Sequence, residues 1–593
     1  MNEEHSARGT DEPADTGFVF DQIDDGVADE AMDATLEAGR GEIRTIPPEE
    51  IERSILDDVL AYFETEYEPS EVGVEAPDPN AIPSQWFDLG YLEECEVVSW
   101  RWSMRPYSYT AIVYDPEENE HRYQVETPNL TEFERYVRED LTRSLRQVLM
   151  HREIGETERR REVFEAEVAE VIDDHAAAVP PSTLLRIVYY LRRDFVRYGK
   201  IDPLMQDPAI EDISCDGADV PLFIYHNAYR DLETNLNFDE DRLDTFVTRL
   251  AQRAGKSLTA ADPLLDASLP DGSRAQFTFG EDVSLRGSTF TIRRFSEDPL
   301  TPTDLIDFGT FSLDQMAYLW LLVENGKSVL FAGGTGSGKT TSLNAISYFV
   351  PPGHKIVSIE DTPELRLPHQ NWVRNVTRES SIAGGHGDIT MFDLLESALR
   401  QRPEFLLVGE IRANPQVAFT FFQAISTGHT AYTTFHADSA EGAMRRLENE
   451  PLNIPSQMIG SLDVVSIQRQ VQTGGQRVRR NHKLVEISPD RDGEGLRTRD
   501  VFARDPATDT FEQRNTSTLL QEIKYERGWD DGRLRRELSL RQEVLRHLRR
   551  EGINHHHDVG RVLYTFYRRP ETVIEQIRAD ALEPTAFSYP WDE

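Results

Sequence analysis

Apolar and polar residues in the second half of the chain form a series of short apolar runs separated by longer mixed segments. The runs 329–332, 356–359 and 405–408 consist mainly of Val, Ile, Leu, Phe and Ala, and polar or glycine-rich residues follow each of them. Such runs are typical of strands that are buried on both faces of a sheet. With helices between the strands, residues 301–505 are predicted to form an α/β domain with a mostly parallel sheet flanked on both sides.

A second pattern precedes this domain and predicts a smaller α+β domain over residues 181–300. Apolar residues recur at the spacing of an amphipathic helix in 181–195 and 241–254, whereas 287–295 alternates between apolar and polar residues as a strand does. Residues 269–274 have the Pro, Asp and Gly of a turn between strands.

The two ends of the chain carry weaker patterns. Residues 1–45 are acidic and poor in aromatic residues, which predicts a disordered tail. Residues 46–180 combine a strand-like stretch at 97–102 with a charged helical stretch at 131–174, and a docking domain and a plain structural domain fit this pattern equally well. Residues 506–593 are predicted to form a helical C-terminal region.

A glycine-rich stretch directly after the first apolar run matches G-x-x-x-x-G-K-[ST] over residues 333–340. Glycines allow successive backbone N–H groups to turn towards a polyphosphate, and the helix that follows points its positive end at the same anion. Lys339 would reach the β- and γ-phosphates, and the Thr340 hydroxyl would ligate Mg²⁺. A glycine-rich turn that binds nothing is the alternative, but the lysine, the threonine and the flanking elements favour a nucleoside triphosphate. The residues expected to bind it are Gly333, Gly334, Thr335, Gly336, Ser337, Gly338, Lys339, Thr340 and Thr341.

Acidic residues end the two later apolar runs. Glu360 and Asp361 follow one predicted strand, and Glu410 ends the other after Gly409, which stands where the usual aspartate of the second motif would be. Ligands of such sheets lie outside the carboxyl ends of the strands, so these acids are expected beside the phosphates. A strand-terminal acid often only caps a helix, but three of them around one phosphate loop favour catalysis. We assign Glu360 to activation of the attacking water, and Thr340, Asp361 and Glu410 to Mg²⁺.

Histidines and basic residues nearby are open to more than one interpretation. His429 and His436 bracket a strand-like stretch and are either sensors of the γ-phosphate or packed structural residues, since no further ligands lie at zinc spacing. The basic cluster 476–483 would contact nucleic acid, an acidic neighbouring subunit or a partner protein. Residues 555–558, with the sequence His-His-His-Asp, are expected in an exposed loop.

The α+β domain adds the arginines Arg274, Arg286, Arg293 and Arg294 to the candidates. Each one alone is expected to be a solvated or salt-bridged surface residue. Because arginine stabilises the charge that develops on a transferred phosphoryl group, their position just before the nucleotide domain also favours a catalytic role.

Composition indicates the setting in which the protein works. The net charge is −43, from 106 acidic and 63 basic residues, and only seven of the basic residues are lysines. An acidic, lysine-poor surface suits a salt-rich, haloarchaeal-like cytoplasm, because molar salt shortens the Debye length to about 3 Å and screens self-repulsion. An acidic mesophilic protein is the alternative. The charge also argues against general nucleic-acid binding.

Cysteine content and hydropathy add two expectations. Cys95 and Cys215 lie far apart and without metal spacing, as expected for a reduced, cytosolic protein. The acidic N-terminus lacks the apolar segment of a signal peptide, and the apolar run 317–323 is far shorter than the ~20 residues that cross a bilayer. We therefore expect a soluble protein that reaches a membrane only through a partner.

In order and content, the motifs resemble those of the type II/type IV secretion superfamily of ATPases, which are the motors of type IV pilus assembly, type II secretion and the archaellum. Gly409 is what that family shows. The resemblance extends upstream to its archaeal branch and covers a little over half of the chain. It rests on residues 333–341, 359–365, 408–412 and 427–438, and upstream on 198–204, 269–274 and 291–295.

The resemblance implies a RecA-like P-loop NTPase domain, a hexameric ring and nucleotide bound between two domains. It also implies that Glu360 is the general base, that Glu410 and His436 belong to the second acidic motif and the histidine box, and that Arg274 and Arg293 reach the phosphates. The four-cysteine zinc module of many bacterial members is absent, since the sequence has only two cysteines, so no zinc site is expected.

The leading hypothesis is a cytoplasmic ATPase that uses ATP and Mg²⁺ to drive assembly of pilin-like subunits, or type II-like secretion, through a polytopic membrane platform protein. An archaellum motor is the alternative within the family, and the intact loop 335–338 favours pilus or secretion. A nucleic-acid translocase and a nucleotide-gated scaffold without turnover are alternatives of other classes. The acidic charge weighs against the first, and the retained Lys339, Glu360 and Glu410 weigh against the second.

Overall fold

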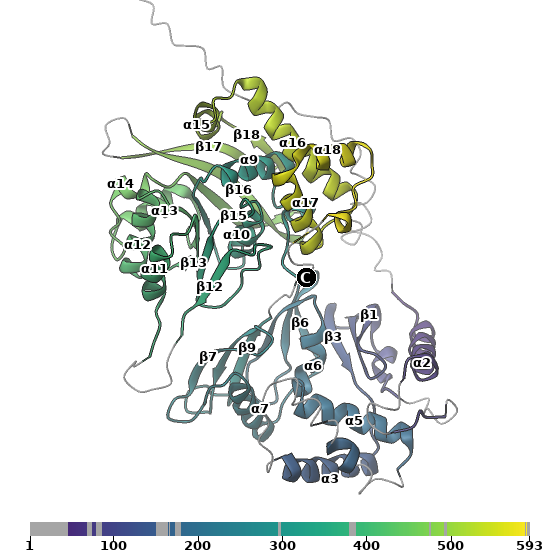
Figure 1. Ribbon diagram of the computed structural model, residues 1–593. Coiled ribbons are helices and arrows are strands. Elements are labelled where there is room, and N and C mark those ends of the chain that lie inside the picture. The colour runs from purple at the N-terminus through teal and green to yellow at the C-terminus, as the bar shows by residue number, and fades with distance from the viewer. Residues whose placement is uncertain are drawn as a thin grey trace, which may run out of the picture. The chain divides into compact units, whose positions relative to one another are not determined.

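The chain folds into two compact units, each built on its own nine-stranded sheet (Figure 1). In the computed structural model, residues 45–294 of the described chain belong to the N-terminal unit and residues 298–589 to the C-terminal unit. Residues 1–44 of the predicted acidic tail lie outside the described residues. Those are 45–67, 74–78, 86–149, 164, 167–171, 179–294, 298–378, 387–473, 476–490, 495–587 and 589.

The sheet of the N-terminal unit is antiparallel except at one junction. Its order is β1-β2-β3-β6-β5-β4-β9-β8-β7, and β3 and β6 are parallel neighbours. This junction places strands from 46–180 and from 181–300 in a single sheet. The strands are β1 (Glu96–Met104), β2 (Ser108–Asp115), β3 (Glu120–Glu126), β4 (Ile210–Cys215), β5 (Phe223–His226), β6 (Arg230–Thr234), β7 (Leu264–Ser268), β8 (Arg274–Thr278) and β9 (Thr289–Arg293).

Helices complete the N-terminal unit, and two of them confirm the helices predicted from apolar spacing. These two are α5 (Pro181–Phe195) and α7 (Glu240–Arg253). In contrast to the expected amphipathic pattern, α5 is buried along the whole of Ser182–Leu191. Further helices are α2 (Pro48–Thr65), α3 (Glu132–Leu149) and α6 (Asp202–Gln206).

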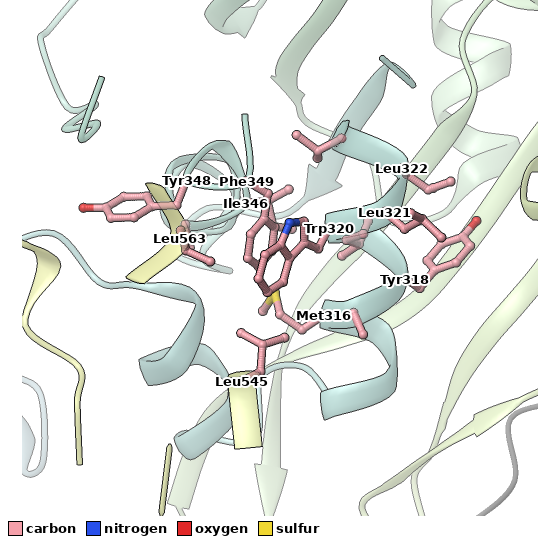
Figure 2. Packing of buried hydrophobic residues seen from close by; sticks show 14 of the residues in the cluster. Met316, Tyr318, Trp320, Leu321, Leu322, Ile346, Tyr348, Phe349, Leu545 and Leu563 are labelled. Carbon is pink, nitrogen blue, oxygen red and sulfur yellow. The ribbon is translucent and has the colours of Figure 1, made fainter. Parts of the chain in front are cut away.

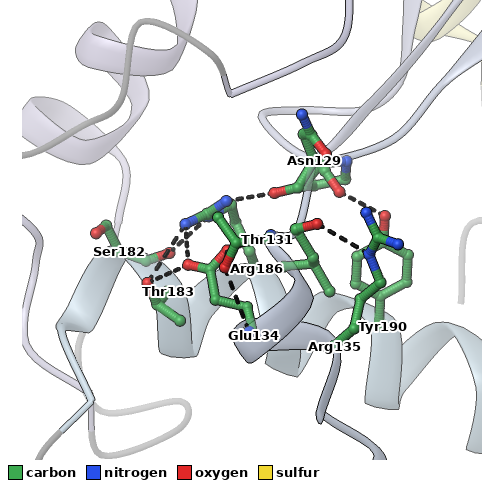
Figure 3. Close-up of polar contacts among 10 residues, drawn as sticks. Asn129, Thr131, Glu134, Arg135, Ser182, Thr183, Arg186 and Tyr190 are labelled. Carbon is green, nitrogen blue, oxygen red and sulfur yellow. Dashed lines mark hydrogen bonds and ion pairs between the residues drawn. The ribbon is translucent and has the colours of Figure 1, made fainter. Parts of the chain in front are cut away.

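The burial of α5 includes a charged side chain, Arg186, whose partners explain how it is accommodated (Figure 3). Its Nη2 donates to Glu134 Oε1 of α3 at 2.6 Å, and its Nη1 donates to the Asn129 carbonyl. The Thr183 hydroxyl donates to the same Glu134 oxygen at 2.6 Å. A buried charge is tolerated when an opposite charge and further hydrogen bonds satisfy it, which is the case here.

The sheet of the C-terminal unit confirms the predicted mostly parallel arrangement. Strands β12-β11-β13-β14-β10-β15 are parallel neighbours, and antiparallel β16, β17 and β18 extend the sheet beyond β15. The strands are β10 (Val329–Gly333), β11 (Ile356–Glu360), β12 (Trp372–Val376), β13 (Phe405–Ile411), β14 (Thr430–Phe435), β15 (Val464–Thr473), β16 (Gln476–Pro489), β17 (Leu496–Asp505) and β18 (Thr510–Gln513).

Helices cover both faces of this sheet (Figure 1). Successive residues of a buried strand point to opposite faces, so each strand contributes side chains to the packing on both sides. Val329 and Phe331 of β10 belong to one hydrophobic cluster, and Leu330 and Ala332 belong to another. The first cluster contains α8 (Pro302–Asp307), α9 (Leu313–Glu324), α10 (Lys339–Ser347), α15 (Thr518–Glu526), α16 (Asp531–Arg550), α17 (His556–Arg568) and α18 (Pro570–Arg578). The second contains α11 (Met391–Arg400), α12 (Pro415–Ser426), α13 (Ala440–Glu448) and α14 (Ser456–Ile459).

The C-terminal helices are part of the main core of this unit. Trp320 of α9 stacks on Phe349 with 4.9 Å between ring centroids, and Leu545 of α16 and Leu563 of α17 lie beside the pair (Figure 2). Within the predicted helical region 506–593, strand β18 (Thr510–Gln513) comes first and the helices α15 to α18 follow it.

One expectation for this region is wrong. Residues 555–558 do not form an exposed loop, because α17 begins at His556 and His555 is its N-cap. The apolar residues that follow, Val559, Val562 and Leu563, recur at helical spacing and are buried, which stabilises a helix there. Among the described residues, no helix combines the length and apolar character that crossing a membrane requires.

Candidate functional site

The phosphate loop joins the end of β10 to the start of α10, as its motif predicts. Gly336 and Gly338 have φ values of 68° and 86°, in the left-handed region that favours glycine. At Gly333 a Cβ atom would lie 2.4 Å from the Gln468 carbonyl oxygen and 2.5 Å from Ser337 Oγ. The loop therefore needs glycine at these positions, for its turns and for its close approach to β15.

Lys339 is buried at the first position of α10, and its Nζ donates to the Gly334 carbonyl at 2.8 Å. Ser337 Oγ donates to the same carbonyl, also at 2.8 Å. Gly334, Thr335 and Gly336 are exposed, so the outer side of the loop faces solvent. Thr340 and Thr341 follow in the first turn of α10 and are half-buried. A helix N-terminus of this kind, with a lysine beside it, is suited to bind phosphate.

Two residues that the motif does not include hold the phosphate loop from the neighbouring strands. Gln470 of β15 and Arg479 of β16 both donate to the Gly336 carbonyl, at 2.9 and 3.0 Å. Sequence reasoning missed this role, because it placed Arg479 in a basic cluster open to external partners. The structure gives other members of that cluster internal partners as well, since Arg480 pairs with Asp509 and Lys483 with Asp500.

Glu360 is the last residue of β11 and is only 2% exposed. Its Oε1 accepts the backbone N–H groups of Glu364 and Leu365, both at 2.9 Å. Burial raises the pKa of this carboxyl from 4.5 to about 7, and the two hydrogen bonds offset part of that rise. A carboxyl with a pKa near neutrality is suited to accept a proton from water.

Glu410 lies at the end of β13 and contacts the histidine that follows β14. Its Oε1 is 2.8 Å from His436 Nε2, and its Oε2 accepts from Arg412 Nε at 2.8 Å. The register between β13 and β14 shifts at Gly409, and such an irregularity re-aims the residue beside it. A Cβ atom at Gly409 would lie in ordinary van der Waals contact with Glu360 Cγ, at 3.5 Å, so this position is directly beside that side chain.

Electrostatics connect these residues to the phosphate loop. Burial lowers the pKa of His436, and the positive charge of Lys339 lowers it further against the opposing effect of Glu410. Asp361 accepts from the Thr377 hydroxyl at 3.1 Å, and one of its oxygens is 3.8 Å from Arg412 Nη1. Since β11, β13, β14 and β10 are adjacent parallel strands, the motif residues at their carboxyl ends share one edge of the sheet.

His429 lies apart from this group of residues. It lies at the amino end of β14, opposite to the end that carries His436. Its Nδ1 is 3.3 Å from the Ala424 carbonyl oxygen of α12. His429 therefore fits the structural interpretation, whereas His436 lies with the acids.

The candidate arginines all lie in the N-terminal unit. Arg274 of β8 and Arg293 of β9 are directly opposite each other in the sheet, and Arg293 Nε donates to Asp212 at 3.2 Å. Arg294 donates to the Ile210 carbonyl at 3.2 Å, and burial lowers its pKa. The backbone of Arg286 lies against Gly217, where a Cβ atom would be 2.6 Å from the Arg286 carbonyl oxygen. The role of Arg274 and Arg293 at the phosphates stays a prediction.

The residues assigned to Mg²⁺ offer the oxygen ligands that this ion prefers. Thr340 contributes a hydroxyl, and Asp361 and Glu410 contribute carboxylates. A cavity of about 400 Å³ adjoins the same edge and includes Arg412, His436 and Arg446 in its lining. Within the described residues, two groups of side chains of types that can ligate a metal lie elsewhere: Asp298 with His555 and His556, and His547 with Glu551 and Asp580.

Two family models and a known archaeal protein together match a large part of the chain. Residues 199–527 match the family model described as type II/IV secretion system protein, and residues 507–584 match the one described as PilB3-like, C-terminal. The chain is 38% identical over 402 residues to the uncharacterized protein MJ0900 of Methanocaldococcus jannaschii. This match spans 67% of this chain and 72% of that protein.

Two further similarities are to a relative and to a solved structure. The chain is 35% identical over 229 residues to the type IV secretion system protein PtlH of Bordetella pertussis. This match spans 35% of this chain and 67% of PtlH. A crystal structure of the pilus retraction motor PilT with bound ADP matches with a TM-score of 0.34 and 21% identity, over 46% of this chain and 78% of that chain.

Proposed function

Because the chain belongs to the family of type II/IV secretion system proteins, we propose that it is an ATPase motor of a secretion or pilus machine. One observation carries this proposal. A phosphate loop, a buried glutamate with a pKa near 7 and a Glu410–His436 pair lie at the carboxyl ends of adjacent parallel strands. These groups together are suited to bind a nucleoside triphosphate and to hydrolyse it.

Binding of ATP is assigned to the phosphate loop, residues 333–341. The exposed backbone of Gly334, Thr335 and Gly336 receives the polyphosphate, and Lys339 turns from the Gly334 carbonyl to the β- and γ-phosphates. Mg²⁺, when held by Thr340, Asp361 and Glu410, supplies positive charge against the phosphate oxygens.

Hydrolysis is assigned to Glu360 as the group that accepts a proton from the attacking water. The backbone N–H groups of Glu364 and Leu365 fix one of its oxygens, so the carboxylate is oriented before substrate arrives. His436 Nε2 and Glu410 Oε1 lie 2.8 Å apart at the carboxyl ends of β14 and β13, and this contact orients both side chains in the site. Arg274 and Arg293 are proposed to stabilise charge on the transferred phosphoryl group.

The wider assembly is also part of the proposal. We assign to this chain a hexameric ring at the cytoplasmic face of the membrane that acts on a polytopic platform protein and, through it, on pilin-like or secreted subunits. The free thiols of Cys95 and Cys215 are consistent with a reducing compartment. An archaellum motor is the alternative within the family.

The test is ATP hydrolysis by the purified full chain in multimolar KCl, with Glu360→Gln and Lys339→Ala. We expect Glu360→Gln to lower kcat by about 100-fold or more while ATP still binds, and Lys339→Ala to weaken ATP binding itself. Glu396→Gln serves as the matched control, because Glu396 is half-exposed on α11 and pairs only loosely with Arg400 at 3.9 Å. Turnover that persists in Glu360→Gln would remove that residue as the base.

Addition of DNA to the same assay separates the motor from a nucleic-acid translocase. The net charge of −43 predicts no stimulation. Strong stimulation would instead favour the translocase, and absence of any turnover at high salt would favour a nucleotide-gated scaffold.

A further inference from the structure

Helix α17 contacts the segment that directly follows the helix of the phosphate loop. Tyr567 Oη donates to the Phe349 carbonyl at 2.6 Å, two residues after the end of α10. The same hydroxyl accepts from Trp320 Nε1 at 2.8 Å, and the Trp320 ring stacks on Phe349 (Figure 2). One face of α17 is therefore joined to the C-terminal end of α10.

The other end of α17 contacts the loop that follows Glu360. At Gly560 a Cβ atom would lie 2.9 Å from Pro368 Cβ and 2.9 Å from Tyr589 Oη, so α17 approaches this loop as closely as a glycine permits. Tyr589 is 4% exposed, and its hydroxyl donates to the Pro368 carbonyl at 2.9 Å. Pro368 is thus held by packing from Gly560 and by a hydrogen bond from Tyr589.

The loop between Glu360 and Pro368 is short and tied at several points. Glu364 and Leu365 donate their backbone N–H groups to Glu360, and the N–H of Arg366 donates to Asn344 Oδ1 of α10 at 2.8 Å. Leu365 and Leu367 are buried in the same hydrophobic cluster as α17. A displacement of Pro368 would therefore reach the N–H groups at 364 and 365 within a few residues.

We propose that α17 and Tyr589 form a C-terminal support that positions Glu360 for hydrolysis through the 364–368 loop. Gly560 and Tyr589 are positioning residues in this arrangement, since they act on Pro368 and the loop carries the effect to the carboxylate. The proposal rests on the proposed role of Glu360 as the proton acceptor. It assigns to the C-terminal helices a part in the reaction beyond filling the core.

The decisive variant is Gly560→Ala in the full chain, because its new methyl group must displace Pro368 or Tyr589. We expect kcat for ATP to fall by about tenfold or more while the ATP dissociation constant stays unchanged, since an error of about 1 Å in a catalytic group is costly. Hydrogen exchange of the amides at 364 and 365 should become faster. Gly532→Ala on α16 is the control, because its Cβ would meet only the Asp530 carboxylate at 3.4 Å.

Tyr589→Phe keeps the ring and removes the hydroxyl that donates to Pro368, so it tests the proposal even if Gly560→Ala does not fold. We expect a few-fold lower kcat, unchanged ATP binding and faster exchange at 364 and 365. Unchanged kcat and exchange in the folded variants would overturn the proposal. So would a joint loss of kcat and ATP affinity without any change at these amides, which indicates plain loss of packing.

The hydrogen-exchange arm also separates this inference from the proposed function. If the wild-type chain binds ATP without hydrolysing it, the proposed function fails, but faster exchange at 364 and 365 in Tyr589→Phe still shows that α17 and Tyr589 hold the loop. If the wild-type chain hydrolyses ATP and the two variants match it, the support fails and the proposed function stands.

Discussion

Each unit of the protein buries one glutamate in a network of hydrogen bonds, and the two networks differ in their donors. Glu134 of the N-terminal unit faces the guanidinium of Arg186, the Thr183 hydroxyl and the backbone N–H of Thr131 (Figure 3). Glu360 of the C-terminal unit accepts only backbone N–H groups among the hydrogen bonds found for it in the described residues. Taken as whole residues, both glutamates are less than a tenth exposed.

The difference in donors, together with the deeper burial of the Glu360 carboxyl, reverses the direction of the pKa shift. Burial alone would raise the pKa of Glu134, but the hydrogen bonds and the Arg186 charge outweigh it and hold the pKa below the ordinary value of 4.5. At Glu360 the effect of burial exceeds that of the two backbone hydrogen bonds, and the pKa rises to about 7. A cationic partner fixes the charged form, whereas backbone donors hold the geometry and leave the protonation state close to balance.

This contrast indicates what each glutamate is for. Glu134 joins α3 to α5, and its lowered pKa favours the charged form near neutral pH, so it suits a structural role. Glu360 is held in place but can exchange a proton near neutral pH, so it suits catalysis. Burial of a carboxyl is therefore not by itself a sign of function, because its hydrogen-bond donors also influence which protonation state is favoured.

The largest expected effect is on stability, from Arg186→Met. Removal of the guanidinium leaves Glu134 buried without its cation, and we expect the N-terminal unit to lose about 3–5 kcal/mol of unfolding free energy. Peptide-resolved hydrogen exchange during a urea titration measures this for each unit separately. Arg143→Met is the control, since Arg143 is exposed on α3 and its contact to Asp140 spans 3.3 Å at the surface. A loss below about 1 kcal/mol would contradict the structural role of the Glu134 network.

The sequence predicted those parts of the site that depend on local chemistry. The phosphate loop is recognisable because its glycines and Lys339 lie close together within residues 333–339, and Glu360 and Glu410 are recognisable because each lies at the end of an apolar strand. The parallel order of the strands then brings these positions to one edge without any further information.

Contacts between distant parts of the chain were not predictable in the same way. Gln470 and Arg479 reach Gly336 only because β15 and β16 pair in a particular register, and no local pattern fixes it. Arg186 finds Glu134 across 52 residues, and Gly560 meets Pro368 across a longer separation. The apolar spacing of α5 showed a helix but not that its charged residue is buried.

The second prediction concerns pH and reverses the usual sign for an acid. Because the folded-state pKa of Glu360 lies above its unfolded value of 4.5, this carboxyl lowers stability progressively as pH rises from 4.5 through about 7. Between about pH 5 and pH 8, the C-terminal unit of the wild type should lose up to about 3 kcal/mol relative to Glu360→Gln. The comparison uses the same urea titration at each pH. An equal pH dependence in both proteins would show that Glu360 is already charged throughout.

The smallest expected effect is that of Thr183→Val, which removes one donor from Glu134 and keeps Arg186. We expect the N-terminal unit to lose about 1–2 kcal/mol near neutral pH, as for a hydrogen bond to a charged group. Because the folded-state pKa of Glu134 is depressed, the stability it contributes is present above 4.5 and is lost as pH falls through the folded-state value. The difference between wild type and Thr183→Val should therefore shrink on acidification. Thr142→Val is the matched control, since the Thr142 hydroxyl donates to the Arg138 carbonyl at 2.7 Å and its contribution does not depend on a titrating group. A pH-independent loss in Thr183→Val, like that in the control, would show that the threonine contributes packing and not charge stabilisation.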